Sequence, residues 1–147
     1  MKKADSTYLA LNTYTKLMRA AESVTNRTSR VMAAAGLTIS QFGVLEALYH
    51  KGPLCQRDVA AKILKSTGNI TLVIDNLEKS ALVRRERDTG DRRYLTVHLT
   101  KSGSELIAKV FVDVEAAIVA EMGSLNGDEQ ELLGKLCKKL GLRGEQQ

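Results

Sequence analysis

The stretch Leu82–Thr100, LVRRERDTGDRRYLTVHLT, is the most informative part of the chain. Two strand-like runs, Leu82–Glu86 and Arg93–Leu99, flank a turn rich in Asp and Gly, which predicts a β-hairpin. Five arginines lie in and beside that turn: Arg84, Arg85, Arg87, Arg92 and Arg93. Guanidinium groups at a hairpin tip suit a phosphate-lined groove better than a protein core.

A short amphipathic helix is predicted immediately before the hairpin, with Ser66 as its N-cap and an end near Ser80. Its apolar stripe follows i, i+3, i+4, i+7 spacing, through Ile70, Val73, Ile74 and Leu77. Its opposite face carries Thr67, Asn69, Leu72, Asn76 and Lys79. A helix followed by a basic hairpin predicts a winged helix-turn-helix that reads DNA.

The rest of the chain is predicted to be helical. Residues 5–35 are predicted to form one long helix that ends at Gly36. One side of this helix carries a seam of apolar and small residues: Leu11, Tyr14, Met18, Ala21, Thr28, Met32 and Ala35. Thr38–Gln41 has the form of a capping box that opens a helix to about His50, and a short helix covers 56–64. Thr100 can cap a helix over 101–122.

A last helix opens at Asn126, and we expect its apolar residues to face inward: Leu132, Leu133, Leu136, Cys137 and Leu140. The predicted fold is therefore mainly α with a small β-hairpin wing (α+β), as one domain over 1–147. Within it, 38–100 forms the winged helix-turn-helix lobe. The helices at 5–35 and 101–140 hold more aliphatic residues than a small domain can bury alone, so we expect them to dimerise.

Composition narrows the class of partner. The 147 residues carry a net charge of +5, which favours a polyanionic partner. Trp is absent and aromatics are few, which argues against a platform that stacks single-stranded bases. The N-terminal MKKADSTYLALN lacks an apolar segment and no run is long enough to span a membrane, so we expect a cytoplasmic protein without a signal peptide.

Catalytic and metal chemistry find little support in the sequence. The sequence has no Gly-rich phosphate loop and no nucleophile motif with a recognisable base. We therefore expect that the protein is not an enzyme and binds no cofactor. Cys55 and Cys137 form no CxxC pattern, which disfavours a disulfide scaffold or a structural zinc site. His50 and His98 lack partners at ligand spacing, so no metal is expected.

The segment from Leu54 to Gly103, LCQRDVAAKILKSTGNITLVIDNLEKSALVRRERDTGDRRYLTVHLTKSG, resembles the MarR family of bacterial transcriptional regulators. Its most specific part, DTGDRRYLTVHLTKSG, is similar to the family's wing pattern. Three positions depart from the family. Leu72 stands where Arg is frequent, Gly68 replaces a polar residue, and Ala81 stands where Gly commonly ends the recognition helix. Because a left-handed conformation strains Ala, we expect that helix to end differently.

Residues at the start of the recognition helix are the candidates for reading base edges in the major groove: Ser66, Thr67, Gly68, Asn69 and Thr71. Asn69 has the chemistry to pair bidentately with adenine. Arg92 or Arg93 would enter the minor groove. Further cations are phosphate candidates: Arg57, Lys65, Lys79 and Arg87. Asp88 and Asp91 are expected to brace the wing by pairing with one arginine so that the other projects.

The resemblance implies a homodimer that binds double-stranded DNA at a pseudo-palindromic operator, with repression favoured. It also implies release by a small aromatic or phenolic effector. We expect four residues to be core rather than ligand contacts: Tyr14, Met18, Phe42 and Phe111. Two alternatives stay open: a thiol-based redox regulator that uses Cys55, where a helix start can raise thiol reactivity, and a protein-interaction module. Cys137 is expected in the core.

Overall fold

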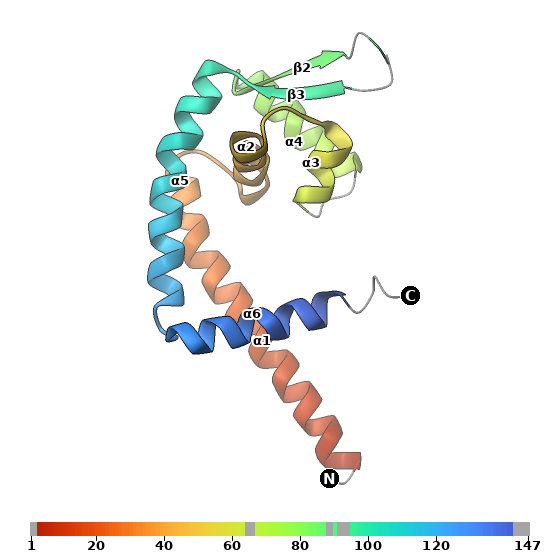
Figure 1. The fold of residues 1–147 in the computed structure, drawn as a ribbon, viewed down its shortest axis with the longest axis vertical. Helices are drawn as coiled ribbons and strands as arrows, with labels where there is room; N and C mark the ends of the chain where they lie inside the picture. The colour runs from red at the N-terminus through yellow and green to blue at the C-terminus, as the bar shows by residue number, and fades with distance from the viewer. Residues whose placement is uncertain (1–2, 64–66, 88–89, 91–94, 143–147) are drawn as a thin grey trace.

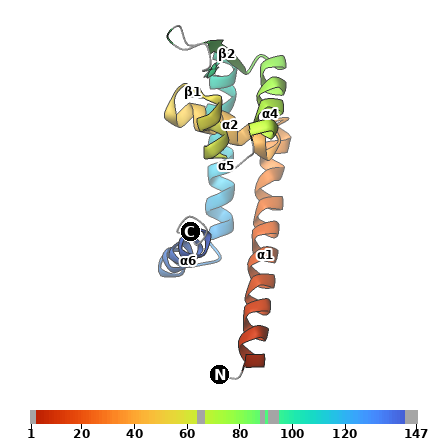
Figure 2. The same ribbon diagram turned by 90° about the vertical axis from the view of Figure 1, so that its right-hand side faces the viewer.

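The computed structural model describes residues 3–63, 67–87, 90 and 95–142, without the side chains of 67 and 68. Its order is α1 (Lys3–Ala34), α2 (Ile39–Lys51), β1 (Leu54–Cys55), α3 (Gln56–Lys62), α4 (Thr67–Lys79), β2 (Val83–Arg87), β3 (Leu95–Leu99), α5 (Lys101–Met122) and α6 (Gly127–Gly141). Figures 1 and 2 show α2 to β3 gathered in a lobe at one end, while α1 runs from the lobe to the opposite end of the molecule. The predicted mainly α fold with a β-hairpin wing is confirmed.

The sheet has three antiparallel strands in the order β1-β3-β2. The predicted hairpin pairs Val83 with Leu99 and Arg87 with Leu95. The third strand, β1, pairs Leu54 with Val97 and was not predicted, because two residues are too few to show an alternating pattern. This strand joins the start of α3 to the base of the wing.

The core lies inside the lobe and against α5 as far as Val114. Its largest fully buried side chains come from α2, α3, α4, both long strands and α5: Val44, Leu45, Val59, Ile70, Ile74, Leu77, Val83, Val97, Ile107 and Val114. The predicted inward stripe of α4 is confirmed, since Ile70, Ile74 and Leu77 are fully buried. Burying each such side chain contributes about 1.5–3 kcal/mol.

Three predicted helix caps are confirmed. Thr38 and Gln41 form a capping box at the start of α2, and Asn126 forms one with Glu129 at the start of α6. The Thr100 hydroxyl accepts a hydrogen bond from the Gly103 amide at 3.0 Å, which caps α5, and donates to the Ala81 carbonyl oxygen at 2.6 Å. Thr100 therefore joins the end of α4 to the start of α5.

The expectation that α4 ends differently at Ala81 is wrong. Ala81 adopts a left-handed conformation with φ of 59°. Its amide donates to the Glu78 carbonyl oxygen at 2.9 Å, and the Leu82 amide donates to that of Leu77 at 3.0 Å, which is the Schellman ending that usually carries Gly. The chain must turn there because Leu77 and Val83 are both buried on either side, and that burial outweighs a strain of about 1 kcal/mol.

The expectation that the apolar residues of α6 face inward is wrong for a single chain. No residue of α6 is buried, and its leucines and Cys137 are exposed. In α1 only Thr28 and Met32 are buried, so Tyr14 and Met18 are not core residues either. The reason is geometric: Figures 1 and 2 show α6 and the N-terminal part of α1 extending beyond the lobe, and of α1 only the remaining part packs against α5.

No single helix of the described chain is long and apolar enough to cross a membrane, although α1 and α2 pass that test as a pair bent by 75°.

Candidate nucleic-acid interface

The outer face of α4 is the centre of the candidate interface. Asn69, Leu72, Asn76 and Lys79 are spaced by three, four and three residues, and all four are exposed. The opposite side of the helix is fixed in the core by Ile70, Ile74 and Leu77. A helix anchored in this way presents one narrow stripe, which is the geometry that an α-helix needs to enter a major groove.

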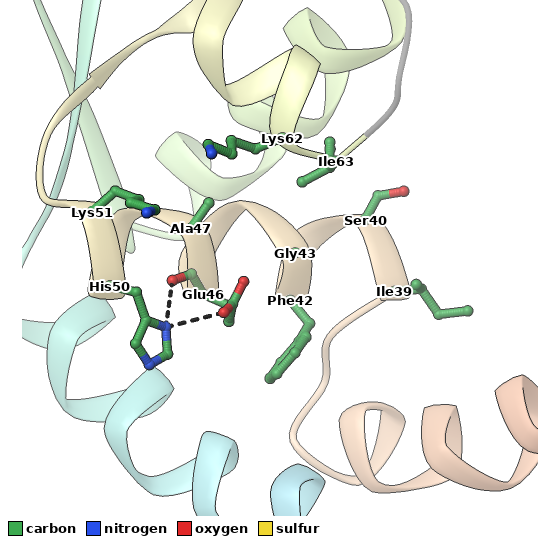
Figure 3. A pocket seen from close by; sticks show the side chains of 10 residues that line it. All are labelled: Ile39, Ser40, Phe42, Gly43, Glu46, Ala47, His50, Lys51, Lys62 and Ile63. Carbon is green, nitrogen blue, oxygen red and sulfur yellow. Dashed lines mark hydrogen bonds and ion pairs between the residues drawn. The ribbon is translucent and has the colours of Figure 1, made fainter. Parts of the chain in front are cut away.

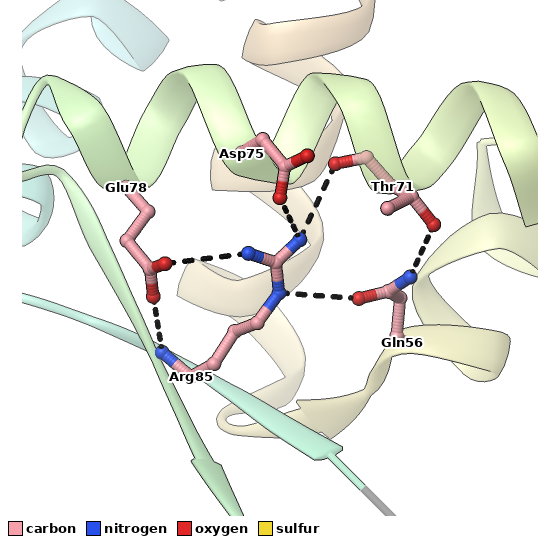
Figure 4. A network of polar contacts seen from close by, with 5 residues as sticks. All are labelled: Gln56, Thr71, Asp75, Glu78 and Arg85. Carbon is pink, nitrogen blue, oxygen red and sulfur yellow. Dashed lines mark hydrogen bonds and ion pairs between the residues drawn. The ribbon is translucent and has the colours of Figure 1, made fainter.

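A single arginine holds α4 to the wing and to the start of α3 (Figure 4). The guanidinium of Arg85, on β2, lies 2.6 Å from the Asp75 carboxylate and 3.3 Å from that of Glu78. It also donates to the Gln56 side-chain oxygen and to the Thr71 carbonyl oxygen, each at 3.3 Å. We call these five residues the Arg85 brace.

Two further hydrogen bonds close the Arg85 brace. The Gln56 amide group donates to the Thr71 hydroxyl at 2.7 Å, and the Arg85 backbone amide donates to Glu78 at 2.9 Å. The Arg85 side chain is only 16% exposed, so water competes weakly for these donors. The brace therefore sets the orientation of α4 relative to β2 and to α3.

Arg84 behaves differently from its neighbour. It points to the other face of β2, is 55% exposed, and pairs with Glu86 at 2.7 Å. His98 on the adjacent strand lies 3.3 Å from the same carboxylate. The Arg84 guanidinium, through its hydrogen bond and its charge, lowers the pKa of Glu86 below its ordinary value, and His98 adds to that effect.

The described part of the chain includes five of the residues predicted to contact DNA. Arg57 is exposed in the first turn of α3, Lys79 in the last turn of α4, and Arg87 at the end of β2. Asn69 lies on the outer face of α4, whereas the Thr71 hydroxyl accepts from Gln56. The packing of α4 against both α3 and β2 brings these elements together in one lobe.

The other predicted site residues lie wholly or partly outside the description. Thr67 and Gly68 belong to the first turn of α4, but their side chains are not described. Six more residues are outside the described ranges: Lys65, Ser66, Asp88, Asp91, Arg92 and Arg93. Their roles stay predictions.

The Arg85 brace was missed by the sequence analysis, which grouped Arg85 with the arginines near the hairpin tip. One signal was available: Arg85 is two residues from the buried Val83 and so shares its face of the strand. Asp75 and Glu78 are three apart on α4 and so lie on one side of that helix. The sequence alone does not show that the two elements meet.

A groove of about 450 Å³ lies between α2 and the end of α3 (Figure 3). Phe42, Glu46 and His50 point from α2 toward α5, and Lys62 at the end of α3, with the next residue Ile63, lines the opposite side. The His50 Nδ1 lies 3.0 Å from the Glu46 carboxylate, and its ring packs edge-on against Phe111 at 4.7 Å. The groove combines an apolar floor with cations at its rim.

A second cavity of about 240 Å³ lies between α2 and α5 and shares Phe42 and Glu46 with the groove. Phe42 is buried, and Phe111 is half-buried against the core and also lines this cavity. Both residues therefore belong to the core and to a cavity wall. No cluster of metal-ligating side chains occurs in the ranges that the structure describes.

Comparisons with known proteins agree with this geometry. A model of the MarR family matches residues 37–95. The chain is 35% identical over 136 residues to the uncharacterized HTH-type transcriptional regulator YkoM of Bacillus subtilis, covering 92% of this chain and 88% of that protein. It is 33% identical over 137 residues to the HTH-type transcriptional regulator MhqR of the same organism, covering 93% and 94%.

The fold matches solved structures as well. Bordetella bronchiseptica BpsR, a protein whose DNA binding is regulated by 6-hydroxynicotinic acid, is 26% identical with a TM-score of 0.80. The alignment covers 88% of this chain and 98% of BpsR. Together with the identity to YkoM and MhqR along most of both chains, this likeness shows that the chain belongs to the MarR family of DNA-binding transcriptional regulators.

Proposed function

We propose that the protein is a homodimeric repressor that binds a pseudo-palindromic operator in duplex DNA. The observation that carries the proposal is the outer face of α4, which is exposed along Asn69, Leu72 and Asn76 while the Arg85 brace holds the helix to the wing strand. A fixed angle between recognition helix and wing suits simultaneous contact with a major and an adjacent minor groove. The net charge of +5 favours the same partner.

In this proposal each group of site residues has its own task. The start of α4, with Ser66, reads base edges through Thr67, Gly68, Asn69 and Thr71. Arg57, Lys65, Lys79 and Arg87 neutralise phosphates, which positions the protein without reading sequence. Arg92 and Arg93 enter the minor groove, with Asp88 and Asp91 fixing the turn.

The exposed apolar residues at both chain ends support the homodimer. Leucines of α6 and residues such as Leu11 and Tyr14 of α1 are exposed in a single chain. In the proposed division, 38–100 is the DNA-binding lobe, and 5–35 with 101–140 form the dimer. Two copies related by a twofold axis would present their α4 helices to half-sites about one helical turn apart.

Selection of bound sequences from random duplex DNA with the full-length protein tests the proposal. We expect a twofold motif, and an affinity that falls linearly with salt on a double-logarithmic plot. No enriched sequence, or binding that does not respond to salt, would contradict it and would favour a protein-interaction module.

The wing is tested separately with Arg92→Ala and Arg93→Ala combined. We expect affinity for the selected duplex to fall at least about tenfold, with the dimer intact, because minor-groove arginines contribute through the narrow groove's negative potential. The matched control is Lys135→Ala with Lys138→Ala, which removes the same charge from α6, far from the lobe in Figure 1. Equal losses in both variants would point to bulk charge rather than to the wing.

We further propose that a small aromatic acid or phenol binds along α2 and releases the operator. The groove in Figure 3 is lined by the aromatic Phe42 and, on its opposite side, by the cation Lys62, and its volume is in the range of small-molecule sites. BpsR, a relative in fold, responds to such a molecule. A panel of phenols and hydroxybenzoates, with 6-hydroxynicotinic acid included, is screened for operator release.

Ile39→Trp places an indole in the mouth of the groove. It should abolish effector-induced release of the operator without changing the affinity of the effector-free protein for the operator. Tyr49→Trp, on the same helix but outside the groove lining, is the control.

Peroxide should leave the operator complex unchanged. If peroxide releases the operator and Cys55→Ser prevents that release, the protein is a redox regulator instead.

A further inference from the structure

Leu72 occupies an unusual position for a large apolar side chain. It lies in the middle of α4, is 62% exposed, and sits between Asn69 and Asn76 on the face that is proposed to meet DNA. An exposed leucine on an ordinary surface needs no explanation. On a helix that enters the major groove, however, the residue at the centre of the exposed stripe lies closest to the base edges.

The helical phase places Leu72 away from the core. It is two residues from Ile70 and two from Ile74, and both of those are fully buried. Two steps along an α-helix turn the side chain by roughly 200°, so Leu72 projects almost directly outward. The Arg85 brace contacts α4 at the Thr71 carbonyl and at the carboxylates of Asp75 and Glu78, so rotation of α4 about its axis is restricted.

The chemistry of the groove then selects the contact. Base edges in the major groove offer hydrogen-bond donors, acceptors and one apolar group, the 5-methyl of thymine. An isobutyl side chain forms no hydrogen bond, and it would leave a donor or acceptor desolvated if pressed against any other edge. We infer that Leu72 contacts a thymine 5-methyl group and so specifies a T·A pair at one position in each half-site.

This inference deepens the proposed function and rests on it. It gives a selective role to the one large apolar residue on the outer stripe formed by Asn69, Leu72, Asn76 and Lys79. An arginine there would favour guanine or phosphate. Exchanging Leu72 for Arg should therefore change which base is preferred instead of simply removing a contact.

The test uses the full-length protein and its selected duplex, with each thymine replaced in turn by deoxyuridine. That replacement deletes only the 5-methyl group and keeps every hydrogen-bonding atom. We expect one twofold-related pair of thymines at which wild-type affinity falls by about fourfold per half-site, the factor expected for losing one buried methyl. Leu72→Ala should bind the unmodified duplex more weakly and be indifferent to that replacement.

Leu72→Met is the conservative control, since it keeps a flexible apolar side chain of similar volume and should retain the sensitivity. Leu72→Arg should shift the selected base at the same position away from thymine. If wild type and Leu72→Ala respond equally to every deoxyuridine, this inference is overturned while the proposed function stands. If no duplex is selected at all, the proposed function fails and the inference falls with it.

Discussion

The two halves of this molecule handle their apolar residues in opposite ways. The lobe from α2 to β3, with α5 as far as Val114, encloses ten fully buried large side chains within one chain. Helix α6 is also amphipathic and well capped, yet it buries none of its residues. The same pattern of apolar spacing thus produces a closed core in one region and an open face in the other.

The difference shows what a hydrophobic stripe specifies. A stripe determines which face of a helix avoids water, but not whether the covering surface belongs to the same chain. A 15-residue helix without tertiary packing is marginal in water, even with a capping box. Helix α6 therefore depends on a second surface in a way that α4 does not. Four substitutions, three in or beside the lobe and one in α6, test this difference.

The largest expected effect comes from Gly103→Ala, which breaks the lobe. A methyl group at Gly103 would overlap with the carbonyl oxygen of Leu82, where the end of α4 meets the start of α5. Neither backbone segment can move freely, so we expect a loss of about 3 kcal/mol or more in the free energy of unfolding by urea. Gly134→Ala in α6 is the control, because nothing lies within 4 Å of the added carbon.

That control should stabilise the protein slightly, since Ala exceeds Gly in helix propensity by about 1 kcal/mol. An unchanged unfolding midpoint for Gly103→Ala would show that the α4–α5 junction is less rigid than described.

The second effect breaks the chain ends and spares the lobe. Leu136 is 55% exposed at the centre of the apolar face of α6. A buried carboxylate there would be strongly unfavourable, so Leu136→Glu should weaken self-association at least about 100-fold in sedimentation experiments. Gly134→Glu adds the same charge on the opposite side of the helix and should leave association intact.

The helical circular dichroism that the lobe contributes should be unchanged in Leu136→Glu, because the core of the lobe contains no residue of α6. A Leu136→Glu protein that still sediments as wild type does would remove α6 from the proposed dimer interface.

The third effect tests the brace inside the lobe. Arg85→Ala leaves Asp75 and Glu78 without their shared cation, and we expect a loss of about 1–2 kcal/mol after allowing for the partial exposure of both carboxylates. Arg84→Ala is matched in residue type and strand but removes an exposed pair, so it should cost less than about 0.5 kcal/mol. Urea unfolding measures both, and equal losses would contradict the brace.

The smallest effect is a gain. Ala81 is left-handed at φ 59°, so Ala81→Gly should raise stability by about 0.5–1 kcal/mol through relief of backbone strain. Gly36 provides the mirror test. It has φ of 77° with open space around it, so Gly36→Ala should lower stability by a similar amount. Thermal unfolding measures both, and a destabilised Ala81→Gly would show that the alanine methyl makes a contact of its own.

Local patterns predicted most of the fold because the physics behind them is local. The caps at Thr38, Thr100 and Asn126 depend on residues three positions apart, and the buried stripe of α4 depends on a 3.6-residue period. The strand β1 escaped detection because two residues carry no period. Ala81 was misjudged because the burial of its neighbours, a property of the whole lobe, decides its conformation.

The candidate site divides in the same way. The sequence by itself determined the residue types on the outer face of α4 and the arginines of the wing, because composition and spacing specify them. Only the tertiary structure decided that Arg85 faces α4 while Arg84 faces solvent. Both orientations depend on how separate elements pack, and the free energy of that packing comes from contacts between residues far apart in the chain.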